Sequence, residues 1–185
     1  MSTTAENPTA ETTSEVPLPP APPEATLAKP DMFMPLEPDS FKPIAGFPAA
    51  DLRPLPAVAK YSGGLANAFV IKANPEYKWQ GAPWHMHHLN VHFNYIVKGW
   101  ALFEFEGVGK VRLEAGTAFY QPPRNRHREL DASSDFEVIA IELPASYPTT
   151  FYALDPETGE YRATVIDAET EGGELTNVVK VDEAG

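Results

Sequence analysis

The sequence predicts an all-β fold, a sandwich or barrel of short strands, on the strength of two features. Apolar segments rich in β-branched and aromatic residues recur at short intervals between positions 66 and 143, and glycine or proline separates them. In contrast, no segment shows a helical period of any length, and the chain contains no internal repeat. Hydrophobic residues make up 43% of the 185 residues, which is enough to bury the core of one domain.

The expected strands follow one another along the chain, with turn residues between them. The strand at 66–73 ends at Asn74-Pro75, and the two strands after it are separated by Lys98-Gly99. A turn at Gly107–Gly109 leads into a Lys-Val-Arg-Leu segment, which alternates polar and apolar residues as a half-buried strand does. The full set of expected strands is 66–73, 89–97, 100–105, 110–113, 117–121, 135–143 and 161–167.

Composition divides the chain into four parts. Residues 1–38 are rich in Pro, Ala, Glu and Thr, and we expect a disordered tail because such a segment buries little apolar surface. Residues 39–59 are expected to form an extended arm whose apolar side chains dock either on the domain or on a second subunit. The β-barrel is expected at 60–148, and a partly disordered acidic extension, loose from about residue 168, at 149–185.

Charge and composition argue against several classes of protein. A net charge of -12 disfavours electrostatic binding to nucleic acid or to an anionic membrane. The absence of cysteine excludes disulfides, thiolate catalysis and cysteine-type zinc sites. No apolar run reaches the length of a membrane span and the first residues lack a secretory signal, so we expect a soluble cytoplasmic protein. Edge strands of a small barrel are commonly covered by pairing, which predicts a homodimer.

A cluster of histidines is the main functional feature of the sequence. Four of its five histidines lie between positions 85 and 92, and the fifth is His127. His85 and His87 have the i, i+2 spacing that puts two side chains on the same face of a strand. Because neutral imidazole is the commonest side-chain ligand for metals, the cluster predicts a metal site. His88 has the opposite parity and is expected to point outward or to the rim.

The segment 81–143 resembles the cupin domain, and the first half of the resemblance lies in the histidine cluster. The first motif of that family runs G-x5-H-x-H-x(3,4)-E-x6-G. This chain has His85-x-His87-x4-His92-x6-Gly99, with a histidine where the family usually has its glutamate. The opening glycine is also displaced, since Gly81 lies only four residues before His85.

The second half of the resemblance surrounds His127. The second cupin motif runs G-x5-P-x-G-x2-H-x3-N. This chain has Gly116-x5-Pro122, followed by His127 at the family's distance, with Arg124 at the second glycine and Asp131 at the asparagine. Two motifs in order and at family spacing are a strong indication of the fold and a weak one of the reaction, because cupins catalyse many reactions.

The resemblance implies a double-stranded β-helix, or jelly-roll barrel, that holds a divalent metal ion. The ligands that it implies are His85, His87, His92 and His127. The position of His92 has the wrong parity for a straight strand, so a bend near Leu89-Asn90 is needed for ligation. The alternative for His92 is a hydrogen-bonding position at the mouth of the site.

Several further residues are candidates for the walls of a substrate pocket. Asn94 shares the parity of His92 and is a candidate for orienting a bound water or substrate, although a polar residue at a sheet edge is equally consistent. An arginine near His127 is a candidate for attracting an anionic substrate, whereas a solvated turn is the simpler alternative. The aromatic candidates have plain core packing as their alternative. The full set of pocket candidates is Trp84, Asn94, Phe103, Phe119, Gln121 and Arg126.

An all-histidine site makes a non-haem dioxygenase the leading hypothesis for the function. Four imidazoles leave the full +2 charge on the ion, which favours an anionic enolate or catecholate of a small-molecule substrate. The resemblance to all-histidine cupin dioxygenases implies cleavage of a carbon–carbon bond with O2, and favours iron(II), followed by manganese, nickel, copper and zinc. No carboxylate is clearly placed as a general base, and Glu129 is undecided. The alternatives are a Lewis-acid isomerase or lyase and a non-catalytic binding cupin.

Overall fold

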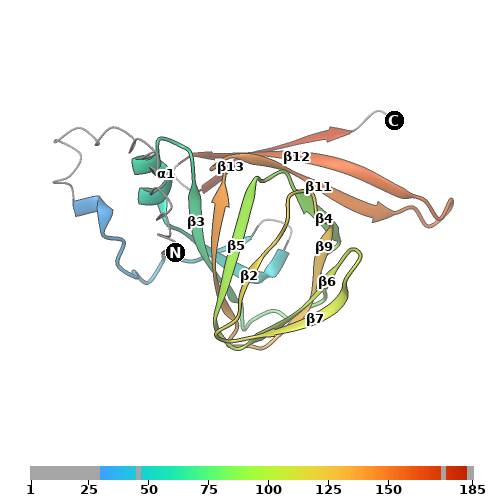
Figure 1. The fold of residues 1–185 in the computed structure, drawn as a ribbon, viewed down its shortest axis with the longest axis horizontal. Coiled ribbons are helices and arrows are strands. Elements are labelled where there is room, and N and C mark those ends of the chain that lie inside the picture. Colours follow the sequence, from blue (N-terminus) through green and yellow to red (C-terminus); the bar gives the residue numbers. More distant parts are fainter. Residues whose placement is uncertain (1–29, 45–46, 172–173, 183–185) are drawn as a thin grey trace, which may run out of the picture.

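The strands of the chain form two antiparallel sheets that enclose a barrel (Figure 1). The structure is a computed structural model that describes residues 30–44, 47–171 and 174–182. One sheet has the strand order β1-β2-β3-β10-β5-β8, and the other has the order β13-β12-β11-β4-β9-β6-β7. The strands are β1 (Lys42–Ile44), β2 (Phe47–Pro54), β3 (Asn67–Ala73), β4 (Trp84–His87), β5 (Val91–Lys98), β6 (Trp100–Phe105), β7 (Gly109–Glu114), β8 (Ala118–Tyr120), β9 (His127–Ala132), β10 (Glu137–Leu143), β11 (Tyr147–Leu154), β12 (Tyr161–Glu171) and β13 (Glu174–Asp182).

The observed strands confirm the predicted all-β fold. Each of the seven segments expected to form a strand overlaps one in the structure, namely β3, β5, β6, β7, β8, β10 and β12. The alternation of side chains along these strands decides which of them face the inside of the barrel. In β5, for example, His92, Asn94 and Ile96 are buried, whereas Phe93 and Tyr95 between them are exposed.

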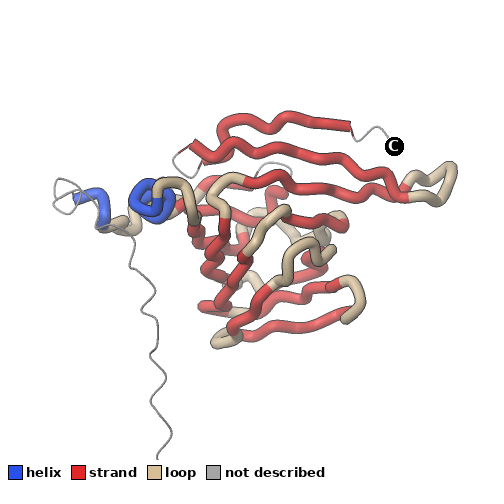
Figure 2. Tube along the Cα trace, turned by 45° about the horizontal axis from the view of Figure 1, so that its top comes forward, coloured by secondary structure: helices blue, strands red, loops and turns tan. Residues whose placement is uncertain are grey.

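The segment that precedes β3 packs against the barrel. β2 pairs with β3, with Leu52 opposite Ile71, so the apolar residues expected in a docking arm extend a sheet of the same chain. After it comes a short helix, α1 (Pro56–Ser62), which begins with proline and ends at Gly63 with a φ of 66°. Seven residues are too few to show a helical period, which explains why the sequence pattern did not reveal α1. Figure 2 shows α1 and the 3-10 turn at Pro30–Met32 together at one side of the molecule.

The C-terminal strands extend the second sheet beyond the barrel. β11 pairs with β4, with Thr149 opposite His87, and β12 and β13 follow outward in the same sheet (Figure 1). The segment expected to be loose from residue 168 contains the end of β12 and all of β13. Residues 172–173 and 183–185 of that segment lie outside the described part of the chain, as do residues 1–29 of the expected disordered tail. No helix among the described residues is long and apolar enough to cross a bilayer.

The interior of the barrel is apolar at one end and polar at the other. Ile96, Phe103 and Val138 belong to the buried hydrophobic cluster at the apolar end. Along β5 and β10 the facing pairs change from Ile96 and Val138 to His92 and Glu142. Both strands keep the same face toward the interior over this length. The pairing register that buries Ile96 and Val138 therefore also places His92 and Glu142 inside the barrel.

The turn between β5 and β6 depends on a glycine. Gly99 has a φ of 63°, and a Cβ atom there would collide with the Ser133 side chain and lie 2.9 Å from the Phe136 backbone nitrogen. The Ser133 hydroxyl accepts a hydrogen bond from the backbone N–H of Trp100 at 2.9 Å, so the collision involves a group that holds the turn. Gly99 is also the glycine that closes the first cupin motif.

Replacing Gly99 by alanine is expected to destabilise the protein by roughly 2 to 4 kcal/mol, because it combines a left-handed backbone with overpacking. Chemical denaturation of the two proteins measures the difference. Gly107→Ala is a matched control, since Gly107 has a φ of 78° but no atom within 4 Å of the place that an alanine methyl group would take. We expect a cost of about 1 kcal/mol there. Equal costs at both positions would contradict the close packing around Gly99.

Candidate metal centre

Three histidines from two neighbouring strands converge inside the polar end of the barrel. His85 and His87 lie on β4, and His127 lies directly opposite His85 at the start of β9. The ring centroid of His85 is 4.9 Å from that of His87 and 4.3 Å from that of His127. Candidate ligand atoms of the three rings all lie within 4.8 Å of one another. The i, i+2 spacing on β4 and the cross-strand pairing together produce this arrangement.

Hydrogen bonds on the far side of each ring set its orientation. Nδ1 of His85 donates to the Pro83 carbonyl at 3.0 Å, and Nδ1 of His127 donates to the Asn125 carbonyl at 3.2 Å. Nδ1 of His87 shares a hydrogen bond of 2.9 Å with the Thr149 hydroxyl. A ring whose Nδ1 carries the proton has a free lone pair on Nε2, as a metal ligand requires. The residues therefore fit a divalent transition metal, which would be bound through three Nε2 atoms.

The turn before His127 is held in an unusual conformation. Arg124 has a φ of 63°, and it is the single non-glycine residue with a positive φ among the described residues. It occupies the position at which the second cupin motif has its second glycine, so the turn keeps the left-handed backbone without the glycine that would favour it. One residue later, Asn125 supplies the carbonyl that holds the His127 ring.

His92 reaches the same region from the other sheet. The loop between β4 and β5 carries the chain across the barrel, which resolves the parity problem seen in the sequence. The His92 ring centroid is 5.2 Å from that of His87 and 6.3 Å from that of His127. However, His92 is outside the group of three whose ligand atoms lie within 4.8 Å, and its Nε2 faces the Glu142 carboxylate at 3.5 Å.

Glu142 and Tyr147 form a buried polar pair behind His92. Glu142 is the cross-strand partner of His92, and the Tyr147 hydroxyl donates to its other carboxylate oxygen at 2.5 Å. Burial raises the pKa of the Glu142 carboxyl to about 7, and the hydrogen bond from Tyr147 opposes this rise. Burial and the nearby Glu142 carboxylate raise the pKa of Tyr147 well above its ordinary value. Glu142 is thus a carboxyl group that both accepts a hydrogen bond and faces an imidazole.

A second carboxylate lies beside the histidines. Glu129 Oε1 is 3.9 Å from Nε2 of His85 and 3.9 Å from Nε2 of His127. Sequence reasoning left Glu129 undecided and did not identify Glu142 or Tyr147. A local signal existed for Glu129, because it follows His127 at i+2 on a strand and therefore shares its face. None existed for Glu142, whose approach to His92 depends on the pairing of β10 with β5.

Three of the histidines, His87, His92 and His127, are kept neutral by their surroundings. Burial and the neighbouring His85 imidazole lower the pKa of His127 to about 4. Burial, followed by the effects of His127 and His85, lowers the pKa of His92 to about 3. Burial and the surrounding imidazoles also hold the pKa of His87 well below its ordinary value. Near neutral pH these rings present lone pairs rather than positive charges, which suits a cation.

A small cleft opens onto the histidines. Its volume is only about 10 Å³, and it is lined by His87, Leu89, His92, residues 121–123, Asn125 and His127. Gln121 and Asn94 are both buried, and within the described residues the Gln121 Oε1 and Asn94 Nδ2 atoms have no hydrogen-bond partner. Of these two predicted pocket residues, Gln121 lines the cleft, and Asn94 lies two residues after His92 on the same face of β5. The unsatisfied acceptor of Gln121 in the wall of the cleft is suited to a small polar ligand.

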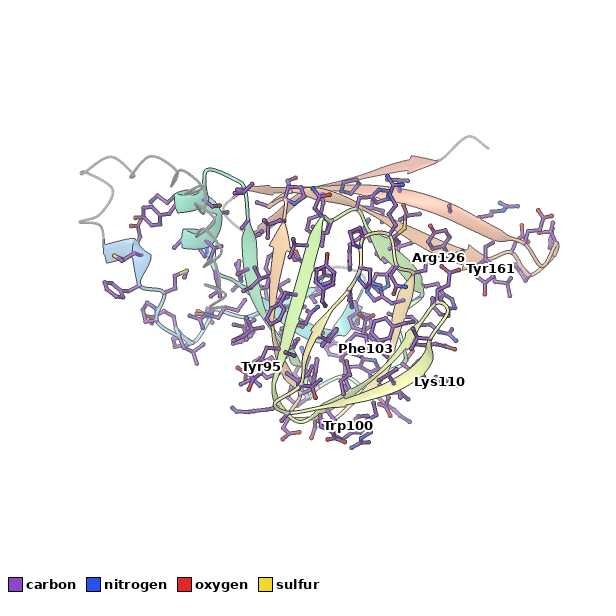
Figure 3. The ribbon with its side chains drawn as sticks, in the orientation of Figure 1. Tyr95, Trp100, Phe103, Lys110, Arg126 and Tyr161 are labelled. Carbon is purple, nitrogen blue, oxygen red and sulfur yellow. The ribbon has the colours of Figure 1, made fainter. Side chains whose placement is uncertain are left out.

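The other four predicted pocket residues lie away from the cleft. Trp84 packs under the Arg128 guanidinium at 4.8 Å, and Arg126 pairs with Glu106 on the outside of the barrel, next to Tyr161 in Figure 3. Each directly precedes a site histidine, so the alternation of a strand turns it to the opposite face. Phe103 is buried inside the barrel (Figure 3). Its ring packs against that of Phe119, with the two centroids 5.5 Å apart. Phe103 belongs to the hydrophobic core, and Phe119 is partly buried against it.

His88 lies outside the group of three, as its parity suggested. Its Nε2 forms a hydrogen bond of 2.8 Å with the hydroxyl of Thr150, a residue that is 2% exposed. His88 therefore helps to hold β11 against β4. It is next to His87 in the sequence, but it is not one of the three histidines whose candidate ligand atoms converge.

Comparison with known proteins gives matches at the level of structure. No family model and no curated protein matches the chain. A sugar phosphate isomerase of the cupin superfamily from Silicibacter pomeroyi is 8% identical, with a TM-score of 0.50 and a match over 74% of this chain and 78% of that one. A proposed sugar phosphate isomerase from Acidithiobacillus ferrooxidans is 14% identical, with a TM-score of 0.50 over 80% and 86% of the two chains.

The DMSP lyase from Ruegeria pomeroyi is 21% identical, with a TM-score of 0.38 over 43% of this chain. The chain spans 39% of the length of that lyase. The two matches with a TM-score of 0.50 share the two-sheet barrel over most of their length. The chain therefore has the cupin fold, a double-stranded β-helix, as its two histidine motifs predicted.

Proposed function

We propose that the protein is a metal-dependent isomerase or lyase that moves a proton on a small polar substrate. The observation that carries this proposal is the buried chain of His92, Glu142 and Tyr147 next to the group of three histidines. His85, His87 and His127 would hold the metal through Nε2. As a Lewis acid, a bound divalent metal polarises a substrate oxygen and makes a neighbouring C–H bond more acidic.

The residues around the centre are suited to handling that proton. His92 lines the cleft, so its ring is placed to accept a proton from a ligand there or to return one. Glu142, facing Nε2 of His92 at 3.5 Å, orients the ring and stabilises its protonated form. The Tyr147 hydroxyl holds the second oxygen of Glu142 and so fixes the carboxylate. The arrangement follows the general pattern of a base oriented by a buried acid.

A dioxygenase is the second candidate function. The lowered pKa values of His87, His92 and His127 support it, since a site in which His92 also binds the metal would leave the full +2 charge on iron(II) or manganese(II). In the sequence, the absence of a clearly placed general base favoured the dioxygenase. That argument does not hold in the structure, because Glu129 and Glu142 both lie beside the histidines. The names of the two isomerase structures are in keeping with the first candidate.

The two functions differ in their need for oxygen and for a redox-active metal. The purified protein is stripped with a chelator, reloaded with zinc, iron(II) or manganese(II), and incubated in D2O both under anaerobic conditions and with O2. The panel of substrates contains small hydroxy acids, keto acids, hydroxyketones and catechols. Deuterium incorporation or product formation with zinc, detected by NMR, supports the isomerase or lyase. Turnover that requires both O2 and iron or manganese would reject it in favour of the dioxygenase.

We also propose that the protein forms a homodimer. Aromatic and aliphatic side chains on the outer face of β5, β8 and β10 support this proposal, because large exposed apolar groups on adjacent strands are typical of interaction surfaces. The side chains are Phe93, Tyr95, Tyr120 and Ile141, with exposed fractions of 37 to 49%. Sedimentation at micromolar concentration is expected to show one species of twice the chain mass, and a single monomeric species would contradict the proposal. The cytoplasmic location remains a prediction of the sequence.

A further inference from the structure

Glu129 has an unusual position beside the group of three histidines. It lies on β9 two residues after His127, with its side chain 21% exposed and pointing to the same face. Its Oε1 atom is equidistant, at 3.9 Å, from the Nε2 atoms of His85 and His127. Among the described residues, these two histidines are the only ion-pair partners of the carboxylate. The Glu129 carboxylate therefore lies between one imidazole nitrogen on β4 and one on β9.

The charges in this arrangement are unfavourable without a cation. Nδ1 donates to a carbonyl in both His85 and His127, so a lone pair on each Nε2 faces the Glu129 carboxylate. A single cation shared by the three nitrogens and the carboxylate satisfies all four groups.

The separations are those of a metal ligand set. With metal–ligand bonds of about 2.1 Å, neighbouring ligand atoms lie roughly 3 to 4 Å apart. His92 is placed differently, because its Nε2 faces Glu142 at 3.5 Å and it lies outside the group of three. His92 also occupies the position at which the first cupin motif has its glutamate. The carboxylate missing from that position is thus present nearby on β9.

We infer that Glu129 is the fourth protein ligand of the metal, and that it substitutes for the motif glutamate that His92 replaces. This inference rests on the metal centre of the proposed function. Three neutral imidazoles and one carboxylate leave a net charge of about +1 on a divalent ion, compared with +2 for four imidazoles. His92 is then free of the metal and remains available to exchange protons with a substrate in the cleft.

The test is a titration of the chelator-stripped full-length protein with cobalt(II) and zinc(II). The visible spectrum of cobalt reports its ligands, and competition with a chromophoric chelator gives the zinc affinity. Glu129→Gln is expected to weaken zinc binding by at least about tenfold, since even outer-shell changes have effects of that size. It is also expected to alter the cobalt spectrum. Glu129→Asp, which keeps the charge on a shorter side chain, is expected to alter the spectrum with a smaller loss of affinity.

Two controls separate ligation from a general structural role. Asp131→Asn removes a carboxylate from an exposed position on the same strand, and we expect it to change neither affinity nor spectrum. The metal-free Glu129→Gln protein is expected to unfold at the same temperature as the wild type or a higher one, because the substitution removes the repulsion described above. A marked fall in that temperature would identify a structural role and overturn the inference.

The remaining outcomes separate this inference from the proposed function. Unchanged affinity and spectrum in Glu129→Gln would overturn the inference while leaving the metal centre intact. The same result together with loss of metal in His92→Gln would show that His92 is the fourth ligand instead. A wild-type protein that binds neither cobalt nor zinc would overturn the metal centre and the inference with it.

Discussion

Replacing His127 by alanine is expected to abolish tight metal binding. His127 is the most deeply buried of the three convergent histidines, with 1% exposure, and it contributes one ring nitrogen to the group of candidate ligand atoms with His85 and His87. The variant keeps only two of the three histidine nitrogens that would bind the metal. We expect its metal dissociation constant to rise by about 100-fold or more, because even the loss of a residue that only contacts a ligand typically weakens binding by about 10- to 100-fold. Metal analysis after gel filtration and competition titration against a chromophoric chelator measure the loss.

The stability of the protein gives a second measurement of the same change. A metal present at 100 times its dissociation constant stabilises a folded protein by about 2.7 kcal/mol, and this increment should disappear in His127→Ala. His88→Ala is the matched control, because His88 lies one residue from His87 but is bonded to Thr150 outside the group of three. It should retain stoichiometric metal. Equal metal loss in both variants would show that the histidine cluster acts through folding rather than through ligation.

Replacing Glu142 by glutamine is expected to lower turnover by about 100- to 10,000-fold, the range typical of general acid–base residues and their partners. The amide keeps the size of the side chain but cannot carry the negative charge that faces Nε2 of His92. It therefore cannot stabilise the protonated ring. Since Glu142 is not among the three convergent histidines, we expect the metal content to remain at the wild-type level. Steady-state kinetics and metal analysis on the same preparation separate the two effects.

The control for this variant lies on the same strand. Glu137→Gln changes a carboxylate at the other end of β10, where it pairs with Lys98 at the surface, and it should leave turnover unchanged. Glu142→Asp, which retains the charge on a shorter side chain, is expected to recover part of the lost turnover. Normal turnover in Glu142→Gln would remove the acid–base role and favour the dioxygenase.

Much of the candidate metal site can be predicted from the local pattern of the sequence. Alternation along a strand is a property of neighbouring residues, so the spacing of His85 and His87 was sufficient to put both on one face. The same rule explains why two of the predicted pocket residues lie away from the cleft. Trp84 and Arg126 each directly precede a histidine that faces the interior, and consequently both lie outside the barrel. Applied to β9, the rule also places Glu129 on the face of His127.

The alternation of side chains along one strand does not predict how strands far apart in the sequence pair with each other. Glu142 is fifty residues from His92 in the chain, and the two face each other only because β10 pairs with β5 in one particular register. Shifting that register by one residue would turn the Glu142 carboxylate to the outer face of the sheet. The hydrogen bond from Tyr147 adds a third strand to the arrangement. Nothing in the spacing of these residues distinguishes them from other polar residues on half-buried strands.

By itself, the sequence determined the all-β fold, the cupin resemblance and the presence of His85, His87 and His127 at positions suited to a common site. Those features depend on short-range alternation, turn residues and the spacing of two motifs. Only the tertiary structure decided that His92 turns toward Glu142, that Glu129 stands beside two of the histidines, and that the C-terminal strands complete the second sheet. The physical reason is that sheet pairing joins segments far apart in the chain, and the packing of the whole barrel selects their register.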